Sequence, residues 1–151
     1  MVHKRLIFIR HAHRDTEIHS RDNGLSDKGK KQVRQVVRFS QNRELEDGLF
    51  LSSPKVRCVE TITPVAEALR SEIQIDARLG EGGTSADLVS FVDWWKYEAP
   101  DLTIACSHGD VIPMLVEKIT GGMISIKKAG WCEIELVGRE TYLTWLVQKY
   151  E

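Results

Sequence analysis

Two kinds of hydrophobic pattern alternate along this chain. Short β-like segments, rich in apolar residues, cover residues 5–9, 48–51, 73–75 and 102–106, and two longer ones cover 131–137 and 142–147. Other segments carry apolar residues three or four positions apart, which predicts amphipathic helices. These segments begin after residue 26, begin after residue 54, and cover roughly 86–97 and 109–119.

Residues at the ends of these segments fit the same assignment. Ser26 can cap the first helix, Ser53 can cap the second with Pro54 at its first helical position, and Gly121 follows the last. Because strands alternate with helices, we expect an α/β three-layer sandwich, with helices on both faces of a mostly parallel central sheet. No low-complexity linker or internal repeat interrupts the pattern, so residues 1–151 are expected to form a single domain.

The composition is that of an ordinary globular protein, with 42% hydrophobic and 28% charged residues in a chain of 151. No apolar run approaches the roughly 18 residues that a membrane helix needs, so no membrane partner is expected. The apolar stretch at residues 6–9 is too short for a signal peptide, which makes the cytoplasm the expected location. The three cysteines are widely spaced and form no CxxC pair, which disfavours a disulfide framework or a structural zinc site.

Charge is unevenly distributed, although the formal net charge is only −1. Residues 1–43 contain 11 Lys and Arg against 4 Asp and Glu, whereas the remaining residues contain 10 against 18. This bias indicates either a solvated basic face on one helix or an electropositive mouth that attracts an anionic substrate. Nucleic acid is not expected as a partner, because no aromatic residues are interleaved with the basic ones.

Reactive side chains follow the predicted strands. His11 follows the first strand, "SSPKVR" follows the second, Glu81 lies in a glycine-rich loop after the third, and "SHGD" follows the fourth. Ligands of open α/β sheets bind beyond the carboxyl ends of the strands. We therefore expect these four clusters to converge on one edge of the sheet and to form the functional site.

The stretch "HAHRD" at 11–15 admits a metal interpretation, since it matches the start of the HxHxDH pattern of metal-dependent hydrolases. However, Thr16 stands where that pattern has its next histidine, and the rest of the chain offers few further imidazole ligands. Arg10 and Arg14 beside the histidines would also repel a divalent cation. A site without metal or cofactor is expected, and a metal-dependent hydrolase is the least favoured alternative.

A phosphate site explains more of these residues. A phosphoryl group needs fixed cationic donors, and the planar guanidinium groups of Arg10 and Arg57 suit its geometry. Arg57 lies in the first turn of a predicted helix, where the amide end also favours anions. His11 can attack phosphorus directly, and His108 can stabilise the charge that develops on the phosphoryl oxygens.

Five successive motifs resemble those of the histidine phosphatase superfamily, which includes phosphoglycerate mutases and phosphohistidine phosphatases. The resemblance spans residues 5–120 in order, in "LIFIRHAHRD", "GLSDKGKKQ", "LSSPKVRCVETITPVAEAL", "RLGEGG" and "IACSHGDVI". It implies a phosphoglycerate mutase-like fold, with Arg10 and His11 as the "RH" pair and His11 as the nucleophile. It further implies that Arg57 is the second phosphate-binding arginine and His108 the second histidine, and Arg14 resembles an extra phosphate-contacting arginine.

Two features depart from the family pattern. Ala12 stands where the family usually has glycine, which is tolerable unless the backbone there needs a positive φ. Two carboxylates compete for the role of proton donor: Glu81 resembles the acid of the mutase branch, and Asp110 resembles that of the phytase-like branch, displaced by one residue. His13 is expected to line the pocket or to contact substrate, and Asp110, if it is not the acid, is expected to bind substrate or to cap a helix.

The expected activity is metal-independent hydrolysis of phosphomonoesters or phosphohistidine through a phosphohistidine intermediate on His11. The partner would be a phosphorylated small molecule or a phosphoprotein. The short segment between the first two motifs leaves the site open, which favours the small phosphohistidine phosphatase-like members. A mutase-type phosphotransferase and a non-catalytic phosphate-binding module are the alternatives, and the oligomeric state is left open.

Overall fold

The computed structural model describes residues 3–16 and 22–150, and its elements follow the order expected from the hydrophobic pattern. In chain order they are β1 (His3–Arg10), α1 (Asp27–Ser40), β2 (Leu49–Ser52), α2 (Val56–Ala68), β3 (Ile73–Ile75), the short 3-10 helix η1 (Ala77–Leu79), α3 (Ser85–Tyr97), β4 (Leu102–Ser107), α4 (Val111–Thr120), β5 (Trp131–Val137) and β6 (Glu140–Val147).

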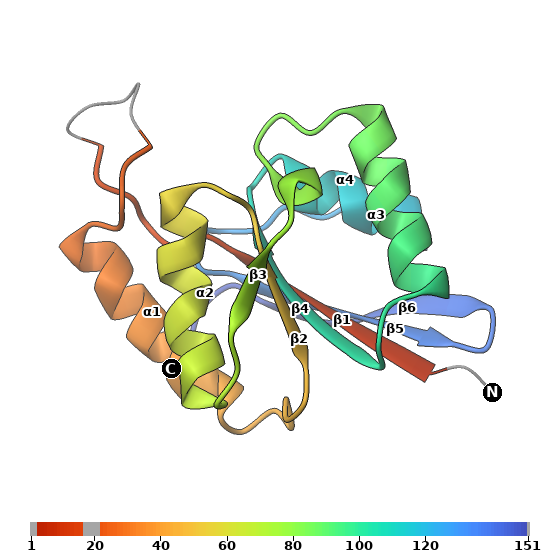
Figure 1. Cartoon of the computed structure of the whole chain (residues 1–151), viewed down its shortest axis with the longest axis horizontal. Coiled ribbons are helices and arrows are strands. Elements are labelled where there is room, and N and C mark those ends of the chain that lie inside the picture. Colours follow the sequence, from red (N-terminus) through yellow and green to blue (C-terminus); the bar gives the residue numbers. More distant parts are fainter. Residues whose placement is uncertain (1–2, 17–21, 151) are drawn as a thin grey trace.

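In the described ranges, the six strands form one sheet in the order β3-β2-β4-β1-β5-β6. The first four strands of this order are parallel, whereas β5 runs antiparallel to β1 and β6 antiparallel to β5. Figure 1 shows α1 and α2 on one side of the sheet and α3 and α4 on the other. The expected α/β sandwich with a mostly parallel sheet is therefore confirmed.

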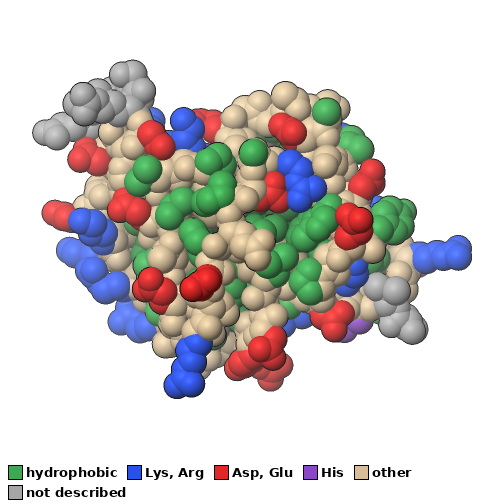
Figure 2. Space-filling view, viewed as in Figure 1, with side chains coloured by type: hydrophobic (Ala, Val, Ile, Leu, Met, Phe, Trp, Pro, Cys, Tyr) green, Lys and Arg blue, Asp and Glu red, His purple; other side chains and the backbone are tan. Residues whose placement is uncertain are grey.

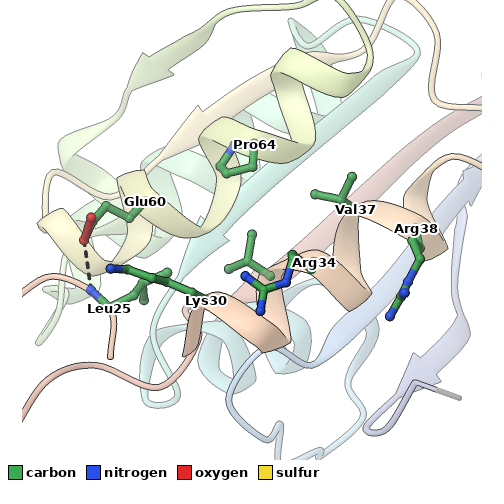
Figure 3. Close-up of a pocket in the computed structure, with 8 residues that line it drawn as sticks. Leu25, Lys30, Arg34, Val37, Arg38, Glu60 and Pro64 are labelled. Carbon is green, nitrogen blue, oxygen red and sulfur yellow. Dashed lines mark hydrogen bonds between the residues drawn. The ribbon is translucent and has the colours of Figure 1, made fainter. Parts of the chain in front are cut away.

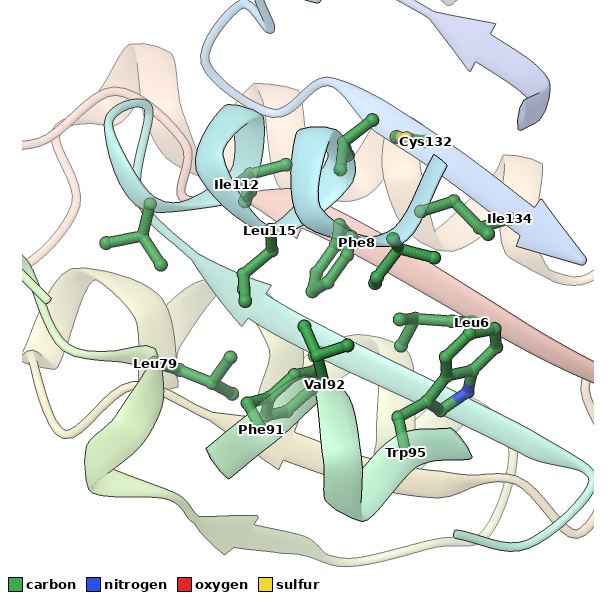
Figure 4. Close-up of a cluster of buried hydrophobic side chains, with 14 of the residues drawn as sticks. Leu6, Phe8, Leu79, Phe91, Val92, Trp95, Ile112, Leu115, Cys132 and Ile134 are labelled. Carbon is green, nitrogen blue, oxygen red and sulfur yellow. The ribbon is translucent and has the colours of Figure 1, made fainter. Parts of the chain in front are cut away.

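Both faces of the sheet are covered, and the centre of β1 shows why residues 6–9 form a continuous apolar run. Leu6 and Phe8 belong to the hydrophobic cluster beneath α3 and α4, and Ile7 and Ile9 belong to the cluster beneath α1 and α2. Alternate side chains of a strand point to opposite faces, so a strand buried on both sides must be apolar at every position. Figure 4 shows the first of these clusters, in which Phe8 lies among side chains from α3 and α4.

The predicted helix ends were right in two places and wrong in one. Ser26 caps α1, where its Oγ accepts a hydrogen bond from Gly29 N–H at 3.1 Å, and Gly121 ends α4 in the left-handed region with φ +78°. The prediction that Ser53 caps α2 with Pro54 as its first residue was wrong. α2 begins at Val56 with Lys55 at its N-cap, and the Ser53 side chain contacts His108 after β4, as described below.

None of the helices in residues 3–16 and 22–150 is long and apolar enough to cross a membrane. All three cysteines are buried and unpaired.

The feature of this fold that matters for function is the edge where the carboxyl ends of β1, β2 and β4 lie side by side.

Candidate active site

The predicted site residues meet at that edge of the sheet. β2 pairs with β4 and β4 with β1, and His11, Ser53 and His108 each follow one of these strands. Two backbone hydrogen bonds extend the pairing past the strand ends. His11 N–H donates to Ser107 O at 3.1 Å, and Ser53 N–H donates to Cys106 O at 3.0 Å. The convergence predicted from separate parts of the sequence is therefore present.

His11 is buried and held in one tautomer. Its side chain is 6% exposed, and its Nδ1 lies 2.8 Å from the carbonyl oxygen of Ala12. Because a carbonyl oxygen can only accept, Nδ1 carries the proton and Nε2 keeps its lone pair. Burial lowers the pKa of His11 to about 4; the bond to Ala12 opposes this shift, and the charges of Arg57 and Arg10 add to it. The imidazole is thus neutral at physiological pH.

A buried threonine fixes the backbone beside His11. Thr61 Oγ1 accepts from Ala12 N–H at 2.9 Å and donates to Arg57 O at 2.7 Å, so it joins the end of β1 to the first turns of α2. Ala12 is not among the described residues with a positive φ, which explains why alanine is accepted where the family usually has glycine. Thr61 was not singled out from the sequence, because one hydroxyl within an amphipathic helix carries no signal.

His108 lies next to His11 and is oriented from behind by a serine. The ring centroids of the two histidines are 5.4 Å apart at an interplanar angle of 61°. His108 Nε2 lies 2.8 Å from Ser53 Oγ and 3.7 Å from Cys58 Sγ, and all three side chains are buried. Ser53 is thus a positioning residue that the sequence placed in the wrong role.

The two predicted phosphate arginines lie close to His11, and each has a buried Nε without a hydrogen-bond partner in the protein. Arg57 is 3% exposed and pairs through Nη2 with Glu81 Oε2 at 2.5 Å, and Arg10 donates through Nη1 to Ile126 O at 2.7 Å. In the described part of the chain, six buried side-chain nitrogen and oxygen atoms lack a hydrogen-bond partner in the protein. Three of them are Arg10 Nε, Arg57 Nε and His108 Nδ1. Buried polar groups are normally satisfied, so three such donors at one place indicate an anionic ligand.

Glu81 and Asp110 occupy different positions. Glu81 is 54% exposed and reaches Arg57. Asp110 precedes α4 without capping it through its side chain; its Oδ2 instead accepts from Gly82 N–H at 3.1 Å. Asp110 therefore fastens the loop that carries Glu81, and this geometry favours Glu81 as the acid. Asp110 stands at the N-cap position of α4, as expected, but its side chain makes no capping hydrogen bond.

His13 and Arg14 lie farther along the same segment. His13 Nδ1 lies 2.6 Å from Oγ of Ser26, so the ring forms a hydrogen bond with the residue that caps α1. The backbone of Arg14 forms an isolated β-bridge with Leu25. Substrate contact by His13, Arg14 or Asp110 remains a prediction.

Lys128 is a cation near the site that was not predicted from the sequence. Burial lowers the pKa of its ammonium group, and the charges of Arg10, Arg14 and Lys28 lower it further, so the four cations are neighbours. The turn containing Lys128 packs on the site because Ala129 N–H donates to the carbonyl oxygens of Arg10 and His11, each at 3.1 Å. The missed signal lies in the topology: β5 is antiparallel, so its beginning lies where β1 ends.

No group of three or more His, Cys, Asp or Glu side chains within 3–16 and 22–150 is placed to hold a metal ion. The rings of His11 and His13, which a metal interpretation of "HAHRD" would bring together, are bound instead to Ala12 and Ser26.

Comparison with known proteins agrees with this geometry. The profile of the histidine phosphatase superfamily (branch 1) matches residues 6–86, more than half of the chain. The chain therefore belongs to the histidine phosphatase superfamily and is an enzyme of the phosphatase class. No protein in the curated set is significantly similar to it in sequence.

Solved structures share the fold at low sequence identity. The protein histidine phosphatase SixA in complex with tungstate has a TM-score of 0.81 at 15% identity, with 95% of this chain and 96% of that chain covered. A putative alpha-ribazole-5'-P phosphatase from Escherichia coli has a TM-score of 0.79 at 16% identity, with the same coverage. A mycobacterial glucosyl-3-phosphoglycerate phosphatase has a TM-score of 0.70 at 19% identity, with 94% and 98% covered.

Proposed function

We propose that this phosphatase hydrolyses phosphomonoesters or phosphohistidine without a metal, in two in-line steps through a phosphohistidine on His11. The tautomer and the lowered pKa of His11 support this, since they leave Nε2 unprotonated and ready to attack. In the first step, the Nε2–P bond forms and the bond from phosphorus to the leaving group breaks. In the second, water attacks phosphorus, and inorganic phosphate leaves with restoration of neutral His11.

The phosphoryl oxygens would be bound by Arg10, Arg57 and His108, and the observation that carries the proposal is that each of them has a buried donor nitrogen without a protein partner. His108 suits this task because Ser53 Oγ can donate to its Nε2, which places the imidazole proton on Nδ1. These donors are fixed before substrate arrives, so they can stabilise the developing charge without reorganising. Loss of one of them should cost ~10²–10³ in turnover.

Glu81 would act as the acid that protonates the leaving group and then as the base that takes a proton from water. Its carboxylate contacts Arg57 and is about half exposed, so it stands between the buried phosphate site and solvent. Asp110 supports this role from behind by holding Gly82.

The exposure of this acid is compatible with a phosphate displayed on a large molecule as well as on a small one. The names of structurally similar proteins cover both cases, because one is a protein histidine phosphatase and another acts on glucosyl-3-phosphoglycerate. A cytoplasmic location is part of the same proposal.

Turnover of p-nitrophenyl phosphate tests this function. Wild-type protein and His11→Ala would be compared in EDTA from pH 5 to 8, with thermal unfolding to check that the variant is folded. The proposal requires wild-type activity that survives EDTA and is lost in the variant. Activity that EDTA abolishes and zinc restores would refute it.

A further inference from the structure

A groove with an apolar floor lies between α1 and α2, outside the site described above. It has a volume of about 520 Å³ and is lined by Leu25, Lys30, Val33, Arg34, Val37, Arg38, Glu60 and Pro64. Figure 3 shows Pro64 on α2 facing α1 across the groove, with Leu25 at one end. Such a volume is ordinary for a ligand-binding cleft.

One wall of the groove carries a row of cations. Lys30, Arg34 and Arg38 are exposed and four residues apart, so they lie on one side of α1 and span about 12 Å of its length. Within the described residues, none of the three forms an ion pair with a carboxylate. Figure 2 shows Lys and Arg side chains gathered along the edge of the molecule that α1 occupies.

The carboxylate in the groove already has a hydrogen-bond partner within the protein. Glu60 is the one acidic side chain among the described lining residues, and its Oε1 accepts from Leu25 N–H at 2.9 Å. The carboxylate therefore fixes the end of the groove, and the cations of α1 are left to face a ligand. An apolar floor beside an uncompensated cationic row matches a ligand with an apolar stripe and adjacent acidic residues.

The groove is connected to the active site through its Leu25 end. The backbone of Leu25 bridges to Arg14, three residues beyond His11, and Ser26 N–H donates to His13 O at 3.1 Å. A chain that lies along α1 and continues past Leu25 therefore approaches the segment that carries the proposed nucleophile.

We infer that the groove docks an acidic amphipathic helix of a phosphoprotein substrate, whose phosphorylated side chain then reaches His11. This inference rests on the proposed phosphatase function and gives its substrate class. A small phosphate ester would not span a cation row about 12 Å long. A helix in a groove would bury apolar side chains at three- and four-residue spacing against Leu25, Val33, Val37 and Pro64. Its carboxylates would face the row on α1.

The test uses a fluorescent synthetic helix with leucines at three- and four-residue spacing and glutamates between them, and a second version in which glutamine replaces glutamate. Binding would be measured for wild-type protein and for the double variant Arg34→Glu/Arg38→Glu. Lys118→Glu/Arg139→Glu is the matched control, because it reverses two exposed cations elsewhere. Each version would also be made with one phosphohistidine beyond the end that faces Leu25, and kcat/KM for phosphate release would be compared.

We expect wild-type protein to bind the acidic helix more tightly than the glutamine version, and increasing salt to weaken this binding. The groove variant should lose at least about ten-fold in affinity and in kcat/KM for the acidic phosphopeptide. It should turn over p-nitrophenyl phosphate as the wild type does, and the control variant should behave as the wild type in every assay.

Equal binding by the groove variant and the wild type would overturn the inference, as would no binding of the acidic helix. Preferential binding to vesicles of phosphatidylserine and phosphatidylcholine, or to an oligonucleotide, would also overturn it in favour of a membrane or nucleic-acid surface. If the acidic helix binds as expected but wild-type protein hydrolyses neither phosphopeptide nor p-nitrophenyl phosphate, the proposed function fails. The docking surface then stands by itself.

Discussion

Gly109 precedes α4, and the absence of a side chain there leaves room for the guanidinium of Arg10. A Cβ added there would lie 2.5 Å from Arg10 Cζ and 2.8 Å from Arg10 Nε. Ordinary contacts of a Cβ begin near 3.4 Å, so the guanidinium would have to retreat by about 1 Å. Arg10 Nη1 is held by Ile126 O at 2.7 Å, and the displacement would strain or break this bond.

The Gly109→Ala substitution should therefore damage activity more than stability. A misplacement of about 1 Å at a group that binds the reacting phosphate can cost ~10²-fold in turnover. The stability cost should stay within about 1–3 kcal/mol, because the contacted atoms are the end of a long side chain and can move. Affinity for inorganic phosphate should fall together with kcat/KM.

Steady-state kinetics, calorimetric titration with inorganic phosphate and thermal unfolding would measure these effects. Gly83→Ala is the matched control, because it lies in the loop of Glu81 and its added Cβ would meet no atom closer than 3.6 Å. If Gly109→Ala keeps wild-type kcat/KM and phosphate affinity, the placement of Arg10 in the phosphate site is wrong. The same conclusion follows if the two glycine variants lose activity equally.

Three further predictions concern protons and their positioning. The folded state should lose stability as the pH falls from about 6.5 towards 4, because unfolded His11 binds a proton in this range and folded His11, with a pKa of about 4, does not. Urea unfolding should show that the free energy of unfolding falls by roughly 3 kcal/mol less over this pH range in His11→Asn than in the wild type. Ser53→Ala should lower kcat about ten-fold with little change in KM and should alter its pH profile, because the hydrogen bond that orients the second imidazole is lost; an unchanged kcat and pH profile would contradict this role. Glu81→Gln should slow hydrolysis of alkyl phosphates far more than that of p-nitrophenyl phosphate, because the leaving group of the latter needs little protonation. If Asp110→Asn shows this difference between the two substrates and Glu81→Gln does not, Asp110 is the acid.

Much of this architecture could be predicted because the signals are local. The run at residues 6–9 is apolar at every position because Ile7 and Phe8 face opposite layers of the sandwich, and that pattern is typical of a central strand. Once strands were assigned, the rule that sites lie at their carboxyl ends brought His11 and His108 together across nearly a hundred residues.

The features that could not be predicted from the sequence depend on tertiary contacts. Ser53 before a proline is a good helix-cap signal, but α2 begins at Val56, and the Ser53 hydroxyl contacts a buried imidazole 55 residues away. Lys128 lies near the site only because β5 runs antiparallel to β1, and the strand order could not be read from the pattern. His13 alternates in sequence with His11, but its ring is taken by Ser26.

The central claim is that His11 carries the phosphoryl group during turnover. Rapid acid-free quenching of wild-type protein with radiolabelled substrate, followed by peptide mass spectrometry, measures this directly. The account predicts an acid-labile, alkali-stable phosphoryl group on the peptide that contains His11, formed before the release of phosphate and absent from His11→Ala. Label found on another residue during full turnover would contradict the claim. It would also be contradicted if no protein became labelled and His11→Ala kept its full activity.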